Sequence, residues 1–280
     1  MKTIQQINEL RDNLKSFRKE GKLIGLVPTM GSLHNGHFSL INTCMVTDDV
    51  TVVSIFVNPT QFNDKNDYRR YPRNTRKDLK LLRKRKCHYA FLPSEKEIYP
   101  EKDTRKFDFG YLDKHMEGKS RPGHFNGVAQ IVSKLFNIIE PDHAYFGEKD
   151  FQQLVIVKAL VSQLNLPVQI ISCPVIREPD GLAVSSRNLL LTSSQRKSAA
   201  RIYAVLSKIK DYAYQMGINE LKEYIKHEVN LDPNLQTEYF EIVQETNLKP
   251  VNNWNENGSK RGCIAVKIGS IRLIDNIKIS

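Results

Sequence analysis

The sequence predicts an α/β protein in which a doubly wound, Rossmann-like parallel sheet precedes a second, smaller α+β domain. From the N-terminus to about residue 175, apolar runs rich in branched side chains alternate with segments of helical periodicity, which is the pattern of a parallel sheet with crossover helices. After about residue 176 the pattern changes to two helical segments followed by strand-like stretches. A length of 280 residues also fits two domains of unequal size.

Local periodicity predicts the elements of the first domain. Apolar side chains recur at spacings of three and four from Ile4 to Leu14, so the segment 1–20 is expected to form an amphipathic helix. Short runs of branched and aromatic residues predict strands at residues 23–27, 51–57, 89–92, 143–146 and 168–173. Helices are expected between these strands at residues 36–47, 75–86, 125–139 and 150–164.

The second domain begins near two prolines. Pro174 and Pro179 interrupt regular structure, so the predicted domains cover residues 1–175 and 176–280. In the second domain we expect helices at residues 193–215 and 218–229, and strands at residues 237–244, 263–268 and 271–276. The polar stretch at residues 252–261 is predicted to be a surface loop between two of these strands.

The net charge of +11 is concentrated in one stretch of the chain. Residues 65–105 hold 14 Lys or Arg against six Asp or Glu, a surplus of eight. A solvated helix face is the simplest interpretation. A patch that attracts an anionic small molecule is the second interpretation, and polynucleotide binding is the third.

Composition argues against several classes of protein. Hydrophobic residues make up 40% of the chain and charged residues 26%, which is typical of a folded globular protein. No apolar run approaches the ~18–20 residues of a membrane span, and the N-terminus lacks the apolar stretch of a signal peptide. The four cysteines form no C-x-x-C pair that would suggest zinc or redox chemistry, so a reducing cytoplasm is the expected location.

The most informative segment runs from Leu26 to His37 and reads L-V-P-T-M-G-S-L-H-N-G-H. It follows a predicted strand and opens a predicted helix, where free N–H groups and the helix dipole attract phosphate. Gly31 and Gly36 would let the backbone approach a ligand closely, while His34 and His37 would lie on one side of the first turn and donate to phosphate oxygens. Nucleotide binding is the favoured interpretation; the alternatives are a capped helix with two incidental histidines and a metal site.

A second polar segment, S-S-R-N at residues 185–188, lies just past the predicted domain boundary. Ser185, Ser186 and Arg187 would make a phosphate clamp, because arginine offers a rigid fork of donors and serine hydroxyls rotate to fit. By itself this segment fits a polar turn that caps the following helix equally well. The H-N-G-H segment earlier in the chain favours the functional interpretation.

Both segments belong to a longer series of motifs. In chain order these are P-T-M-G-S-L-H-N-G-H (28–37), S-I-F-V-N-P-T-Q-F (54–62), Y-P-R (71–73), R-P-G-H-F-N-G-V (121–128), F-G-E-K-D-F-Q-Q (146–153) and R-E-x-D-G-L-A-x-S-S-R-N (177–188). In these motifs the sequence resembles the pantothenate synthetases, or pantoate–β-alanine ligases, of the adenylate-forming nucleotidyltransferase superfamily. The C-terminal part of the chain, after about residue 190, carries no matching motif, and there the resemblance implies only a small lid-like domain.

The resemblance implies a two-step, ATP-dependent ligase. The carboxylate of (R)-pantoate would attack the α-phosphate of ATP and give pantoyl adenylate and pyrophosphate. The amine of β-alanine would then attack the acyl carbon, releasing AMP and pantothenate. Contacts to the phosphates during this reaction are assigned to His34, His37, Lys149, Ser185, Ser186 and Arg187.

The resemblance also implies where the substrates bind. The expected nucleotide site comprises Met30, Gly31, Ser32, Leu33, His34, Asn35, Gly36, His37, Gly147, Glu148, Lys149, Asp150, Ile176, Val184, Ser185, Ser186 and Arg187. Within this set, Asp150 would accept hydrogen bonds from the ribose hydroxyls. Gln61 and Gln153 are the expected pantoate ligands, since an amide both donates and accepts.

Further expectations concern the metal, one arginine and the assembly. Mg²⁺ would bridge the phosphates, and Asp78 is the only candidate protein ligand, although a place on the helix surface is favoured for it. Arg121 is weighed equally between contact with a phosphate or carboxylate and a structural turn. The family implies a homodimer, and neither a nucleic-acid nor a membrane partner is expected.

Two alternative functions remain. One is another H-x-G-H nucleotidyltransferase, such as a cytidylyltransferase or a fragment of an aminoacyl-tRNA synthetase. A synthetase would normally show a lysine-rich K-M-S-K-S loop where this chain has V-S-S-R at residues 184–187. The other is a nucleic-acid-binding protein, which only the basic stretch suggests.

Overall fold

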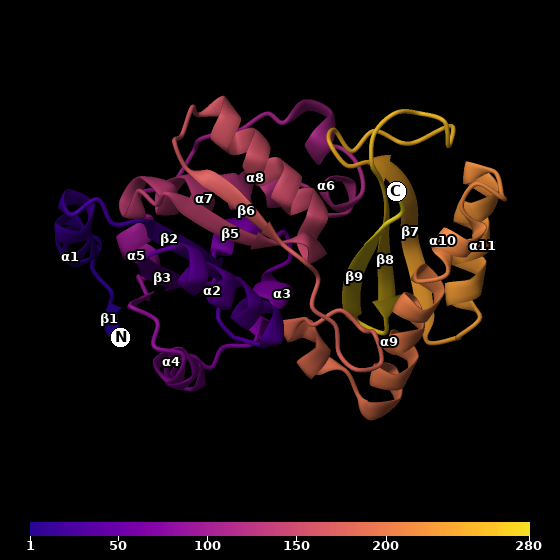
Figure 1. The fold of residues 1–280 in the computed structure, drawn as a ribbon. Coiled ribbons are helices and arrows are strands. Elements are labelled where there is room, and N and C mark those ends of the chain that lie inside the picture. Colours follow the sequence, from indigo (N-terminus) through magenta and orange to yellow (C-terminus); the bar gives the residue numbers. More distant parts are fainter.

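The computed structural model describes all 280 residues and shows two lobes (Figure 1). The larger lobe contains a six-stranded parallel sheet in the spatial order β1-β4-β3-β2-β5-β6. Its strands are β1 (Lys2–Ile4), β2 (Ile24–Thr29), β3 (Val50–Ile55), β4 (Tyr89–Phe91), β5 (His143–Gly147) and β6 (Gln169–Cys173). The predicted α/β class and parallel sheet are confirmed.

Side chains of the parallel strands alternate between two cores, one on each face of the sheet. Leu26 and Val52 belong to the core beneath α1 (Ile7–Lys19), α7 (His124–Ile139) and α8 (Phe151–Gln163). Val27 and Val53 belong to the opposite core, beneath α2 (Asn35–Thr47) and α4 (Thr75–Lys84). Because both faces are covered, these strands read as continuous apolar runs in the sequence.

The remaining elements of the large lobe are short. They are α3 (Lys65–Arg70), α5 (Glu95–Ile98), α6 (Glu117–Ser120) and the 3₁₀ turns Pro59–Gln61, Gly110–Asp113 and Glu148–Asp150. The predicted helix over the segment 1–20 is partly wrong, since the helix begins only at Ile7 and the segment 2–4 forms β1 at the edge of the sheet. A strand this short shows no periodicity of its own.

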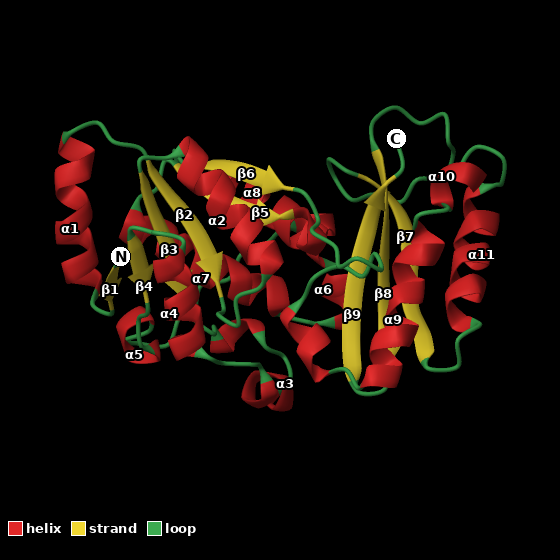
Figure 2. Cartoon of the chain, turned by 60° about the horizontal axis from the view of Figure 1, so that its bottom comes forward, coloured by secondary structure: helices red, strands yellow, loops and turns green.

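The smaller lobe packs α9 (Ser193–Leu206), α10 (Ile209–Tyr212) and α11 (Ile218–Asn230) against an antiparallel sheet (Figure 2). This sheet has the order β7 (Leu235–Gln244), β8 (Lys260–Ile268) and β9 (Ile271–Lys278). Two predictions need correction: the helix expected at residues 193–215 is broken after Leu206, and the loop expected at residues 252–261 ends where β8 begins at Lys260.

A capping box begins α9. The hydroxyl of Thr192 accepts a hydrogen bond from the N–H of Gln195 (3.2 Å), and the side chain of Gln195 accepts from the N–H of Thr192 (3.1 Å). The S-S-R-N segment therefore does not cap this helix. Most of it belongs to a separate 3₁₀ helix, Ser186–Leu190, that faces the large lobe.

Polar contacts join the two lobes on the side of α6 and the turn after β5. Arg261 on β8 pairs with Glu148 at 3.1 Å, and Arg272 on β9 pairs with Glu117 at 2.7 Å. The small lobe also contributes Val243, Leu248 and Cys263 to a core of the large lobe. The predicted division at residue 175 stays a prediction.

The basic side chains of residues 65–86 are all exposed except Arg85, whose guanidinium lies 3.5 Å from the centroid of the Phe38 ring. This exposure agrees with a solvated face, and the role of the basic stretch 65–105 stays a prediction. All four cysteines are buried free thiols. None of the helices combines the length and apolar character that crossing a membrane requires.

Candidate functional site

A cavity opens at the point where the strand order of the large sheet reverses. β2 pairs with β3 along its whole length, from Ile24 to Thr29, but with β5 only at Gly25 and Leu26. Beyond those residues β2 and β5 separate, and Pro28 has no N–H to donate to a ladder. Since β3 and β4 lie on one side of β2 and β5 and β6 on the other, this is the switch point at which α/β sheets bind ligands.

The loop that follows β2 is held by a distant carboxylate. Asp78 on α4 accepts hydrogen bonds from the N–H groups of Ser32 and Leu33, both at 2.8 Å, and is buried. Gly31 and Ser32 have φ angles of 78° and 52°, in the region that favours glycine. The expected helix-surface position of Asp78 is wrong, because its buried carboxylate supports this loop. Its assignment as a magnesium ligand stays a prediction.

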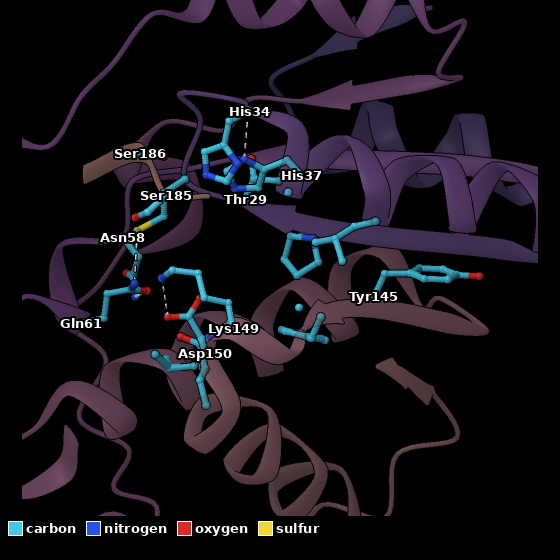
Figure 3. Close-up of a pocket in the computed structure, with 18 of the residues that line it drawn as sticks. Thr29, His34, His37, Asn58, Gln61, Tyr145, Lys149, Asp150, Ser185 and Ser186 are labelled. Atoms are coloured by element: carbon cyan, nitrogen blue, oxygen red, sulfur yellow. Dashed lines mark hydrogen bonds and ion pairs between the residues drawn. The ribbon is translucent and has the colours of Figure 1, made fainter. Parts of the chain in front are cut away.

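His34 and His37 lie on one side of the cavity at the start of α2, with ring centroids 4.0 Å apart (Figure 3). The N–H of His34 donates to Nδ1 of His37 (3.3 Å), which leaves the proton of His37 on Nε2. Burial and then Lys149 lower the pKa of His34 to about 4, and burial followed by His34 lowers the pKa of His37 well below its usual value. Both rings are therefore neutral at pH 7 and offer N–H donors rather than charges.

The turn after β5 brings a cation to the other side of the cavity (Figure 3). Lys149 extends its ammonium to within 3.8 Å of the Asp150 carboxylate. Asn276 on β9 donates to the carbonyl groups of Glu148 (2.8 Å) and Lys149 (3.0 Å), so the small lobe fixes this turn. The side chain of Glu148 is paired with Arg261 and does not line the cavity.

The S-S-R segment reaches the same cavity from the connection between the lobes. Ser186 Oγ donates to the carbonyl of Ser32 (3.2 Å), which brings the segment against the loop after β2. Ser185 Oγ accepts from the N–H of Arg187 (3.3 Å). The Arg187 guanidinium forms an ion pair with Asp67 on α3 at 3.0 Å.

Gln61 and Gln153 also line the cavity. The amide of Gln61 donates to Sδ of Met30 (3.2 Å). The turn that carries Gln61 lies directly on α7, because Gly127 leaves room for it: a Cβ there would lie 2.2 Å from the carbonyl oxygen of Thr60. A glycine is therefore required where this turn meets the helix.

The cavity has a volume of about 230 Å³ and is lined by the large lobe and by the connection between the lobes. Predicted site residues that line it are Met30, His34, Gly36, His37, Gln61, Gly147, Lys149, Asp150, Gln153, Ile176, Val184, Ser185, Ser186 and Arg187. Those that do not are Gly31, Ser32, Leu33, Asn35, Asp78 and Glu148. A second cavity of about 650 Å³ adjoins the first and shares Arg121, Lys149, Asp150, Ser185 and Arg187 with it.

Sequence reasoning missed Asn58, Tyr71 and His124, which also line the cavity. His124 Nδ1 donates to the carbonyl of Gln61 (2.8 Å), so its Nε2 accepts from Arg121 (3.2 Å). Burial and then Arg121 lower the pKa of His124 to about 3, which keeps it neutral. All three missed residues lie inside the quoted motifs, and that position was the available signal.

Known proteins resemble this chain over almost its whole length. The family model described as pantoate-beta-alanine ligase matches residues 2–278. Proteins named pantothenate synthetase are 50% identical in Bacteroides fragilis and 49% identical in Porphyromonas gingivalis, in each case over 278 residues and 99% of both chains.

Solved structures show the same fold. A pantothenate synthetase from Thermus thermophilus is 38% identical, with a TM-score of 0.93 over 100% of this chain and 99% of that chain. A pantoate-beta-alanine ligase from Francisella tularensis, complexed with beta-gamma ATP and beta-alanine, is also 38% identical, with a TM-score of 0.84 over 100% and 98% of the two chains. Because the family model and the relatives match from end to end, this chain belongs to the pantoate–β-alanine ligase family of enzymes.

Proposed function

We propose that the protein condenses (R)-pantoate with β-alanine through a pantoyl-adenylate intermediate. In the first step a carboxylate oxygen of pantoate bonds to the α-phosphorus of ATP, and the bond to the bridging oxygen of pyrophosphate breaks. In the second step the β-alanine nitrogen bonds to the acyl carbon, AMP leaves with the former carboxylate oxygen, and the nitrogen loses a proton. Family membership and the relative complexed with beta-gamma ATP and beta-alanine support this proposal.

The triphosphate is proposed to lie between the two imidazoles and Lys149. His34 and His37 are neutral, so they offer hydrogen bonds to phosphate oxygens without a full charge. Lys149 supplies the positive charge for the departing pyrophosphate. Donors that are held in place before the reaction stabilise developing charge with little reorganisation.

Ser185, Ser186 and Arg187 are proposed to contact the phosphates from the opposite side. Arg187 now pairs with the Asp67 carboxylate. A phosphate would replace this anion with another that the same guanidinium fork can bind. The proposed exchange therefore leaves Arg187 paired throughout.

The other cavity residues are proposed to select the substrates. Met30, Gly147, Ile176 and Val184 would surround the nucleotide, and Asp150 would accept from its ribose hydroxyls. Gln61 and Gln153 would bind the hydroxyl and carboxylate groups of pantoate. The cavity residues Gly36, Asn58 and Tyr71 contribute to the same enclosure.

Magnesium is proposed to enter with the nucleotide. No group of three or more His, Cys, Asp or Glu side chains in the protein is arranged to hold a metal ion. Mg²⁺ is commonly held by substrate phosphates, waters and one or two carboxylates. Apart from Asp150, which is proposed to bind the ribose, no carboxylate lines the cavity. These residues fit an ion held mainly by the phosphates, where it would offset their negative charge.

We further propose a homodimeric enzyme of the cytoplasm, on the strength of the family resemblance. Buried free thiols at all four cysteines suit a reducing compartment. Light scattering of the purified protein tests the dimer: a mass twice that of the 32.2 kDa chain is expected, and a monomer would contradict it.

The observation that carries the proposed function is the meeting of His34, His37 and Lys149 around one cavity at the switch point. The test measures pyrophosphate release from ATP with and without pantoate, and then AMP and pantothenate after addition of β-alanine. Release that depends on pantoate is expected. Release without pantoate, or no release at all, would overturn the proposal.

Two variants test the assigned roles. His34→Ala and Lys149→Ala are expected to slow single-turnover pyrophosphate release by about 100-fold while urea unfolding stays cooperative. Lys158→Ala, at an exposed lysine of α8, is the matched control and should behave as the parent protein. Parent-like release in His34→Ala or Lys149→Ala would contradict these roles.

A further inference from the structure

Glu117 and Arg121 lie one helical turn apart at α6, where the two lobes meet. The Glu117 carboxylate accepts hydrogen bonds from both terminal nitrogens of Arg272 on β9, each at 2.7 Å, and from the hydroxyl of Tyr239 on β7, also at 2.7 Å. Nη1 of Arg121 is 3.8 Å from the same carboxylate. Glu117 is only 6% exposed, so its charge is neutralised almost entirely by these neighbours.

Arg121 lines both cavities and needs a counter-charge. Its pKa is lowered by burial and next by the positive charge of Arg187. His124, which shares a hydrogen bond with Arg121, is neutral and cannot offset this repulsion. The only carboxylate that forms an ion pair with Arg121 is Glu117.

The backbone at Glu117 is fixed independently of the small lobe. Its N–H donates to the side chain of Gln152 (3.0 Å). The preceding residue, Met116, has a φ angle of 47°, which is strained for a side chain of this size. Gly118 lies so close to the preceding turn that a Cβ there would be 1.9 Å from the carbonyl oxygen of Asp113. The position of Glu117 is therefore set by the large lobe, and the orientation of its carboxylate by Arg272 and Tyr239.

We propose that Glu117 is a positioning residue of the ligase reaction: its carboxylate, oriented by Arg272 and Tyr239 of the small lobe, holds the Arg121 guanidinium at the cavity. The positive charge that Arg121 presents to an anionic substrate then depends on docking of the small lobe. This inference rests on the proposed function, since Arg121 acts only if the cavity binds anionic substrates.

Glu238 provides a matched control. It also binds Arg272, at 2.9 Å, and its side chain is partly buried. It forms no ion pair with Arg121. Glu238→Gln therefore weakens the hold on Arg272 without removing the counter-charge of Arg121.

The test is a double-mutant cycle on pantoate-dependent pyrophosphate release. Glu117→Gln and Arg121→Gln are each expected to lower kcat/KM about tenfold, and the double variant to be no slower than Arg121→Gln alone. Arg272→Gln should reproduce the kinetic effect of Glu117→Gln and have no further effect in the Arg121→Gln background. Glu238→Gln should stay within about twofold of the parent protein. Urea unfolding of each variant establishes that it is folded under the assay conditions.

Several outcomes would overturn the proposal. If Glu117→Gln lowers kcat/KM by the same factor with and without Arg121, Glu117 does not act through Arg121. If the parent protein is active and Glu117→Gln is equally active, the positioning role is refuted and the proposed function stands. If the parent protein itself is inactive, the proposed function is refuted. If Glu117→Gln does not fold, Glu117→Asp takes its place in the cycle. The aspartate keeps the negative charge but has a side chain shorter by one methylene, so its carboxylate lies farther from Arg121. Glu117→Asp is then expected to lower kcat/KM by a smaller factor, and to have no effect in the Arg121→Gln background. An equal loss of kcat/KM in both backgrounds would refute the proposal.

Discussion

Asp78 offers the sharpest test of how the cavity is held together. Each of its oxygens accepts one backbone hydrogen bond, from Ser32 and from Leu33, in a buried setting. A hydrogen bond to a charged group contributes about 1.5–3 kcal/mol. Asp78→Asn keeps one acceptor oxygen and loses the other, so we expect the free energy of unfolding to fall by about 2–3 kcal/mol. Asp78→Ala loses both acceptors and is expected to cost about 3–6 kcal/mol.

The same change should slow the reaction, because the supported loop leads directly into His34. A displacement of about 1 Å in a catalytic group lowers a rate about 100-fold. We therefore expect Asp78→Asn to lower pantoate-dependent pyrophosphate release by about 10-fold to 100-fold at saturating Mg²⁺. The Mg²⁺ concentration that gives half the maximal rate should not change.

Urea unfolding and a Mg²⁺ titration of pyrophosphate release measure these effects. Asp49→Asn is the control, because Asp49 also accepts from a backbone N–H, that of Leu23 at 2.9 Å, but is largely exposed. It should cost less than about 1 kcal/mol. If Asp78→Asn unfolds as the parent protein does but needs more Mg²⁺, Asp78 is a metal ligand and the loop-support role is refuted.

Three further perturbations address other parts of the molecule. Folding lowers the pKa of His34 from 6.5 to about 4, so the unfolded chain binds more protons than the folded chain between these two pH values. The free energy of unfolding therefore falls as the pH drops from 6.5 toward 4, by up to about 1.4 kcal/mol per pH unit. In His34→Gln the free energy of unfolding in urea should fall less steeply across this pH range. If the variant and the parent protein show the same pH dependence, burial does not lower the pKa of His34. Gly127→Ala should raise the KM for pantoate about tenfold or more, because the new Cβ would displace the Thr60 carbonyl and the turn that carries Gln61, the proposed pantoate ligand. An unchanged KM in steady-state assays would count against that turn as the pantoate site. Asp48→Asn should lower the free energy of unfolding in urea by about 3 kcal/mol, since this fully buried carboxylate accepts a hydrogen bond from the Tyr145 hydroxyl. A loss below about 1 kcal/mol would refute the stabilising role of Asp48.

Periodicity predicted most helices and parallel strands to within a few residues, because both faces of the sheet are buried and the strands read as apolar runs. It failed where an element was too short or depended on a partner. β1 is a three-residue strand that exists through its pairing with β4. The early start of β8 at Lys260 likewise depends on its pairing with Gln244 at the end of β7.

The motifs identified most of the cavity lining, because residues at strand ends and helix starts meet at one edge of a parallel sheet. They did not separate side chains that face the cavity from those that hold it. Glu148 lies within F-G-E-K-D-F-Q-Q, yet its carboxylate is paired with Arg261 of the small lobe. Gln152 and Gln153 are neighbours, but the Gln152 amide is bonded to backbone groups and only Gln153 lines the first cavity.

Local pattern and motif spacing were enough to establish the α/β class, the resemblance to the ligase family and the loops that line the cavity, since these are properties of contiguous residues. The roles of Asp78, Glu117 and Glu148 emerged only from the folded chain. Each is a carboxylate whose partners are distant in the chain or belong to the other lobe. Its function as support, counter-charge or link between the lobes depends on distances that no local pattern records.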